Sequence, residues 1–201
     1  KLQEPFLGKP LAYHVVTALE DVPFKARFVV CSGTELDFAS RGYAVLHNHN
    51  PDDGMSGSVK LGVAAAREIG CAAVVIALAD MPRVTATHIH RLLEAASGPD
   101  AVVASSNGVH SSPPALFGVD QFDALMTLSG DEGGRAMVRA GRHVIAPEAE
   151  LLDIDRPERR GEGTDLDLTV GDVWHGVDRQ LGELPKAEAA DDEKKGEYRP
   201  A

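Results

Sequence analysis

Apolar residues gather in short runs along this chain, and polar turns separate the runs. The strongest run, Ala-Ala-Val-Val-Ile-Ala-Leu-Ala, covers residues 72–79 and is too short to cross a membrane. A continuous apolar run rich in β-branched residues is typical of a strand buried on both faces, as in a parallel sheet between helices. The run ends at Asp80, and the chain turns there because Pro82 disfavours helix at the residue before it.

Segments with helical spacing alternate with shorter apolar runs through most of the chain. Thr85 can cap a helix, and Pro10 suits the first position of another. We expect helices over 10–19, 34–41, 58–69, 85–96, 122–128, from 135 onward and 172–181, and strands over 26–31, 43–47, 72–79, 100–105, 115–117, 142–146 and 151–154. Such alternation predicts an α/β fold with a parallel sheet.

Length and charge limit the classes of protein that fit. The chain has 201 residues, which suits one domain, here predicted over 1–181 and followed by an acidic, disordered tail over 182–201. A net charge of −11 argues against nucleic acid and anionic membranes as partners. Cys31 and Cys71 adjoin apolar runs and are expected to be buried thiols in a reducing compartment, so we expect a cytoplasmic protein.

Acidic residues follow two of the predicted strands. Asp80 follows the 72–79 run, and Asp153 and Asp155 would share one side of the last predicted strand. If the two strands are neighbours, these carboxylates converge where open α/β sheets bind ligands, and they suit Mg²⁺ held with substrate phosphates. The residues alone leave two other interpretations open: Asp80 as a solvated turn residue, and Asp155 as the N-cap of a helix.

Two stretches rich in small residues lead into predicted helices. In Asn50–Gly62, the residues Gly54, Ser56 and Ser58 would let backbone N–H groups face a nucleotide, although a tight, Ser-capped loop has the same composition. In 130–135, Asp131 can cap a helix and Arg135 could grip a phosphate, or the two could pair on the surface.

The histidines do not favour a zinc site. His88 and His90 are two apart, which separates them around a helix, and no Cys/His spacing of zinc type occurs in the sequence. A Ser-His-Asp hydrolase is equally unsupported, because no GxSxG motif is present.

Six motifs, taken together and in order, resemble one family. They are Lys1-Leu with Gly8-Lys9-Pro10-Leu11, Asn50-Pro51 with Gly54-Met55-Ser56-Gly57-Ser58-Val59, Leu78-Ala79-Asp80-Met81-Pro82, Pro114-Ala115-Leu116-Phe117, Gly130-Asp131-Glu132-Gly133-Gly134-Arg135, and Asp153-Ile154-Asp155-Arg156-Pro157-Glu158. This set is similar to the MobA-like nucleotidyltransferases, and within them most resembles the molybdenum cofactor cytidylyltransferases, which join CMP to molybdopterin.

The resemblance implies a three-layer α/β/α sandwich, Rossmann-like, with a mostly parallel sheet. It implies attack by an acceptor phosphate on the α-phosphorus of an NTP, with CTP favoured over GTP, Mg²⁺ as cofactor and pyrophosphate released. The acceptor would be a molybdopterin-type molecule, and a molybdoenzyme or chaperone is an implied partner. The residues that match family positions are Asp80 and Asp155 for the metal, Lys1 for the phosphate-loop lysine, Asn50, Gly54, Ser56 and Ser58 for the nucleotide, and Asp131 and Arg135 for the substrate.

The sequence also departs from the family pattern. The family's first strand and its LAAGxSxRMG phosphate loop are missing before Lys1, so we expect an N-terminally truncated chain that is inactive as it stands. Asp165 and Asp167 are a second match to the family's terminal metal motif. The alternatives are a MobA-like oxidoreductase of the nicotine blue oxidoreductase type and a non-catalytic domain that binds the molybdenum cofactor.

Overall fold

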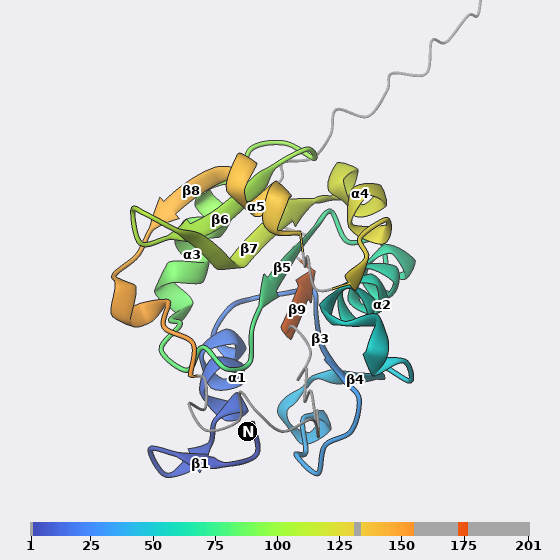
Figure 1. The fold of residues 1–201 in the computed structure, drawn as a ribbon, viewed down its shortest axis with the longest axis vertical. Coiled ribbons are helices and arrows are strands. Elements are labelled where there is room, and N and C mark those ends of the chain that lie inside the picture. Colours follow the sequence, from blue (N-terminus) through green and yellow to red (C-terminus); the bar gives the residue numbers. More distant parts are fainter. Residues whose placement is uncertain (1, 131–133, 155–172, 177–201) are drawn as a thin grey trace, which may run out of the picture.

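The computed structural model describes residues 2–130, 134–154 and 173–176, and it is built around a seven-stranded sheet in the order β4-β3-β9-β5-β7-β6-β8 (Figure 1). The strands are β3 Ala26–Cys31, β4 Ala44–His47, β5 Ala73–Ala77, β6 Val102–Ser106, β7 Ser111–Gly118, β8 Arg142–Ile145 and β9 Val173–Gly176. β3 pairs with β4, and β6 with β8, in parallel, whereas β7 and β9 pair antiparallel with both of their neighbours. The other five strands therefore run in one direction, which confirms the predicted α/β fold with a mostly parallel sheet.

Helices cover both faces of this sheet. Figure 1 shows α1 (Ala12–Glu20) and α3 (Ala86–Ala95) on one face, and α2 (Met55–Glu68), α4 (Phe122–Met126) and α5 (Arg135–Ala140) on the other. Along β5, Val75 packs in the core with α1 and α3, whereas Val74 and Ile76 pack in the core with α2 and α4. Because successive side chains of a strand point to opposite faces, one apolar run supplies both cores. This arrangement is the predicted three-layer sandwich.

The predicted cap of α3 is confirmed, whereas the predicted start of α1 is shifted. The hydroxyl of Thr85 accepts a hydrogen bond from the backbone N–H of His88 at 3.1 Å and so caps α3. The Leu7-Gly8 turn joins β1 (Pro5–Phe6) to β2 (Lys9–Pro10), with both turn residues at positive φ. α1 begins at Ala12 rather than at Pro10 because Pro10 belongs to this hairpin.

Three other predictions of elements were wrong. Residues 151–154 form no strand and instead follow the 3₁₀ turn Glu148–Glu150 along the carboxyl edge of the sheet. Residues 173–176 form β9 instead of a helix, because pairing with β3 and β5 satisfies their backbone groups and overrides local spacing. Of 34–41, only Ala39–Arg41 is helical, as a 3₁₀ turn. Further 3₁₀ turns are Pro51–Asp53 and Val119–Gln121, and the predicted tail over 182–201 lies outside the described residues.

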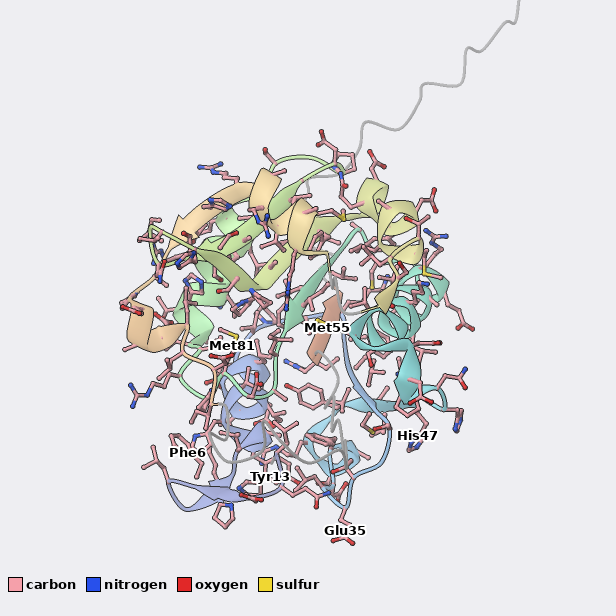
Figure 2. The ribbon with its side chains drawn as sticks, viewed as in Figure 1. Phe6, Tyr13, Glu35, His47, Met55 and Met81 are labelled. Atoms are coloured by element: carbon pink, nitrogen blue, oxygen red, sulfur yellow. The ribbon has the colours of Figure 1, made fainter. Side chains whose placement is uncertain are left out.

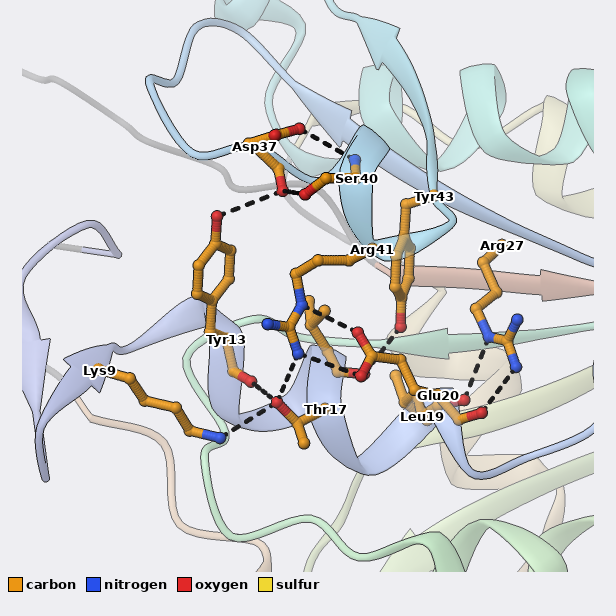
Figure 3. A network of polar contacts seen from close by, with 11 residues as sticks. Lys9, Tyr13, Thr17, Leu19, Glu20, Arg27, Asp37, Ser40, Arg41 and Tyr43 are labelled. Carbon is orange, nitrogen blue, oxygen red and sulfur yellow. Dashed lines mark hydrogen bonds and ion pairs between the residues drawn. The ribbon is translucent and has the colours of Figure 1, made fainter.

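A polar network fastens the connection between β3 and β4 to α1 (Figure 3). Arg41 forms an ion pair with Glu20 at 2.9 Å and donates to the hydroxyl of Thr17 at 2.8 Å. Its guanidinium also lies 4.7 Å from the centre of the Tyr13 ring, which is a favourable cation–π position. The Tyr43 hydroxyl donates to the carbonyl of Val16, deeper in the same region. These contacts serve the fold, because they join α1 to a surface connection.

Candidate functional site

The first part of the site is the loop that follows β5. All residues of β5 are buried, Met81 is 2% exposed, and Asp80 between them is half-buried. The turn is closed by the backbone N–H of Met81, which donates to the carbonyl of Leu78 at 3.3 Å. Asp80 therefore lies at the carboxyl end of a central strand, as the sequence predicts, and this is where open α/β sheets bind ligands.

The segment 148–154 crosses directly over this loop. The backbone N–H of Ile154 donates to the carbonyl of Asp80 at 3.0 Å, and the hydroxyl of Thr85 donates to the carboxylate of Glu150. Ile154 also packs against the core on the α1 and α3 face. Residues 151–154 form no strand, but these contacts bring the segment to the Asp80 loop. The two segments are therefore neighbours, which was the condition for the predicted convergence of their carboxylates.

A cavity of about 300 Å³ opens beside the Asp80 loop. Its lining residues come from α2, the loop after β5, the start of β7, α5 and the crossing segment: Met55, Leu78, Met81, Ser111, Ser112, Pro113, Arg135, Val138, Arg139, Leu151 and Asp153. In Figure 2 the side chains of Met55 and Met81, from α2 and the loop after β5, both lie near the centre of the view. The cavity is thus apolar in its body, with a few polar groups, as small-molecule sites commonly are.

Two exposed arginines of α5 supply positive charge to the cavity. Arg135 and Arg139 are four residues apart, so they stand one helical turn from each other on the same side of α5. Within the ranges that the structure describes, neither forms an ion pair or a hydrogen bond. They are therefore available to bind an anionic group, and guanidinium groups bind phosphate bidentately.

The small-residue loop before α2 lies at the same edge but uses its hydroxyls internally. Gly54 has φ 67° and ψ −160°, which favours glycine, and Met55 after it reaches the cavity. The Ser56 hydroxyl donates to the carbonyl of Asp53 at 2.9 Å. The hydroxyl of Ser58, which is fully buried, accepts from the Nδ2 of Asn48 at 3.3 Å.

Asn50 begins the turn that leads into this loop. Its backbone N–H donates to the side-chain oxygen of Asn48, and its carbonyl accepts from the backbone N–H of Asp53. Gly57 is tightly surrounded, because a Cβ there would lie 3.1 Å from the Cβ of Asp53. The loop is therefore held in one shape by its own polar groups, from side chains and backbone alike.

The structure brings together some of the predicted site residues and is silent on others. Arg135 and Asp153 line one cavity, and Asp80 lies in the loop beside it. Lys1, Asp131, Asp155, Asp165 and Asp167 lie outside the described residues. The sequence alone did not predict that Arg139, Ser111 and Met81 line one cavity. Only the spacing of Arg139 four residues after Arg135 signalled a shared face.

Clusters of metal-ligating side chains and membrane-spanning helices are both absent from the described ranges. No group of three or more His, Cys, Asp and Glu side chains that could hold a metal occurs there. The rings of His47 and His49 stack at 6.3 Å, and both side chains are exposed. In the described part of the chain, no helix has the length and apolar character needed to cross a membrane.

Comparisons with known proteins agree with this architecture. The family model of the MobA-like NTP transferase domain matches residues 1–145. The purine catabolism protein PucB of Bacillus subtilis (strain 168) is 34% identical over 113 residues, which are 53% of this chain and 54% of PucB. The chain therefore spans about half the length of this curated relative.

Solved structures show the same fold at lower identity. Rv0371c from Mycobacterium tuberculosis H37Rv has a TM-score of 0.62 at 19% identity, over 77% of this chain and 83% of that chain. A complex of Rv0371c with manganese has a TM-score of 0.59 at 17% identity, over 78% and 87%. Since the family model covers well over half of the 201 residues, this chain belongs to the MobA-like NTP transferase domain family.

Proposed function

We propose that this protein is a nucleotidyltransferase that moves CMP, or GMP, from an NTP onto a phosphate-bearing acceptor of the molybdopterin type and releases pyrophosphate. One observation carries the proposal: an apolar cavity lined by two exposed arginines opens beside the Asp80 loop at the carboxyl edge of the sheet. An apolar body suits a ring system, and the arginines suit its phosphate. Family membership supports the reaction class.

A divalent cation, which we propose to be Mg²⁺, fits the donors at this edge. Asp80 and Asp155 would hold it. The backbone N–H of Ile154, the last described residue before Asp155 in the sequence, donates to the carbonyl of Asp80. Carboxylate oxygens are the hard ligands that Mg²⁺ prefers, and phosphate oxygens and waters commonly complete its shell. When bound, the cation would neutralise charge that develops on the nucleotide phosphates.

One set of residues of the protein would then bind the nucleotide, and another would bind the acceptor. The loop with Asn50, Gly54, Ser56 and Ser58 would lie against the nucleotide, its small residues permitting close approach, and Lys1 would contact the phosphates. Arg135 would bind the acceptor phosphate, and Asp131 would belong to the same substrate-binding segment. Such an arrangement acts by holding the attacking oxygen and the α-phosphorus together, which is the main contribution a protein makes to this class of reaction.

Relatives and partners extend the proposal beyond the reaction. PucB is named for purine catabolism, and its 34% identity supports a related process for this chain. We infer that the nucleotide-modified product passes to a molybdoenzyme or to the chaperone of one.

Calorimetry with CTP and GTP in the presence of Mg²⁺ tests the proposal, together with pyrophosphate release when molybdopterin is added. In a version that carries the family's first strand and phosphate loop before Lys1, we expect binding of CTP that EDTA abolishes, and pyrophosphate release that needs the acceptor. Asp120→Asn is the matched control for Asp80→Asn, because Asp120 is exposed in the turn before α4. Failure of both nucleotides to bind with Mg²⁺ would overturn the proposal.

A further inference from the structure

A buried hydrogen-bond chain lies behind the cavity wall formed by residues 111–113. The Nε2 atom of His88 in α3 lies 2.7 Å from the hydroxyl oxygen of Ser105 in β6. This hydroxyl donates to the carbonyl of Pro114 in β7 at 2.6 Å. His88 is 1% exposed and Ser105 is fully buried, so water does not compete for either bond.

This hydrogen-bond chain ends at an irregularity in the pairing of β6 with β7. Ala104 pairs with Ala115, but the next residue, Ser105, pairs with Ser112, so Pro113 and Pro114 stand outside the ladder. Prolines have no backbone N–H, and the regular ladder cannot be restored across them. The carbonyl of Pro114 is buried and needs a donor, which the Ser105 hydroxyl supplies. Bulges of this kind re-aim side chains, and this one directs Ser112 and Pro113 to the cavity.

The proton positions in this hydrogen-bond chain follow from its last acceptor, the carbonyl of Pro114. The Ser105 hydroxyl has one proton, which it donates in the hydrogen bond to the carbonyl of Pro114. Its oxygen must therefore accept the hydrogen bond from Nε2 of His88. The Nε2 atom therefore carries the imidazole proton. Burial lowers the pKa of His88, with a smaller opposing effect of Glu150 and a smaller supporting effect of Arg91. The ring is thus neutral near pH 7, and its Nδ1 has no hydrogen-bond partner among the described residues.

We propose that His88 and Ser105 are positioning residues, which hold the bulge of β7 and thereby shape the wall of residues 111–113 that the acceptor contacts. Neither side chain lines the cavity, so they act only through Pro114 and the wall. The identity of the ligand rests on the proposed function, whereas the holding of the wall does not.

Amide hydrogen exchange tests the structural half without any ligand. We expect exchange at Ser112 and Ala115, which flank the bulge, to be about tenfold faster in Ser105→Ala, because the carbonyl of Pro114 loses its donor. Ser106→Ala is the matched control, since the neighbouring Ser106 hydroxyl accepts from the backbone N–H of Gly108 in the turn and not from the His88 side. Unchanged exchange in a folded Ser105→Ala protein would overturn the proposal.

Steady-state kinetics tests the acceptor half. In Ser105→Ala we expect the KM for molybdopterin to rise about tenfold while the KM for CTP stays within about twofold. His88→Gln keeps a side-chain N–H donor and should remain near wild type, whereas His88→Leu should behave like Ser105→Ala. Equal effects on both KM values, or a His88→Gln variant that behaves like His88→Leu, would overturn the acceptor half of the proposal. His88 and Ser105 would then have a purely structural role.

The two proposals fail in different ways. If the wild-type protein releases no pyrophosphate with any acceptor, the proposed function and the acceptor half of this inference fall together, and hydrogen exchange alone decides whether the wall is held by His88 and Ser105. If the wild-type protein is active and Ser105→Ala matches it in both measurements, only the inference fails.

Discussion

Two serine pairs at the same edge of the sheet have opposite orientations. Ser56 and Ser58, in the loop before α2, are buried and bond to Asp53 and Asn48 within the protein. Ser111 and Ser112, at the start of β7, are half-buried and line the cavity. The hydroxyls of the first pair stabilise their own loop, whereas the side chains of the second pair reach the cavity. One residue type therefore serves two different purposes within one site.

Asp80 lies at the same edge of the sheet as both serine pairs, and its replacement should have the largest effect. Asp80→Asn keeps the size of the side chain but removes the charge that would hold the cation. We expect a loss of about 100-fold or more in the rate of pyrophosphate release, which corresponds to about 3 kcal/mol. The thermal unfolding midpoint serves as the check that the variant folds. A rate within about threefold of the Asp120→Asn control would show that neither pair adjoins a metal-dependent centre.

The second prediction concerns the cavity side of the comparison. Arg135→Gln should raise the KM for a phosphate-bearing acceptor by about tenfold to 100-fold, because a charge-assisted hydrogen bond to phosphate is lost. The KM for CTP should change little, because we assign the nucleotide to the loop before α2 and the acceptor to α5. Arg91→Gln is the control, because Arg91 is an exposed arginine of α3, on the opposite face of the sheet. A parallel rise in the KM for CTP would assign Arg135 to the nucleotide.

Sequence patterns located the segments of this site better than its side chains. The run 72–79 and the capping residue Thr85 predicted β5, its turn and α3, because burial and capping leave local signals. No local pattern shows whether a serine after a glycine faces inward, since this depends on Asn48, a residue from the preceding strand connection. The segment 151–154 was wrongly predicted as a strand because its apolar residues pack over a loop instead of pairing.

A third prediction separates support of the loop from contact with the nucleotide. Ser58→Ala removes the acceptor for the buried Nδ2 of Asn48, so we expect the free energy of unfolding to fall by about 1–3 kcal/mol. Denaturant unfolding measures this, with the exposed Ser97→Ala as control. The Kd for CTP should rise much less than the stability falls. A large rise in Kd with unchanged stability would contradict the inward role of Ser58.

The fourth prediction uses the buried histidine behind the second serine pair. The pKa of His88 is lowered in the folded protein from its ordinary value of 6.5, chiefly by burial. The unfolded chain therefore takes up this proton first, and the contribution of His88 to stability is complete above about pH 6.5 and declines as the pH falls below it. Denaturant unfolding of the wild type and of His88→Gln across this range should give curves that diverge toward acid. Parallel curves would show that His88 accepts a proton in place.

The smallest effect on stability is expected at Ser112. Its hydroxyl donates to the neighbouring carbonyl of Pro113 at 2.9 Å, and the side chain is half-buried, so Ser112→Ala should change the free energy of unfolding by no more than about 0.5 kcal/mol. The KM for the acceptor should nevertheless rise, because the side chain lines the cavity. We therefore expect Ser58→Ala to lower stability more than it weakens substrate binding, and Ser112→Ala to do the reverse. Equal ratios of stability loss to substrate effect in the two variants would mean that the orientation of a hydroxyl does not decide its purpose here.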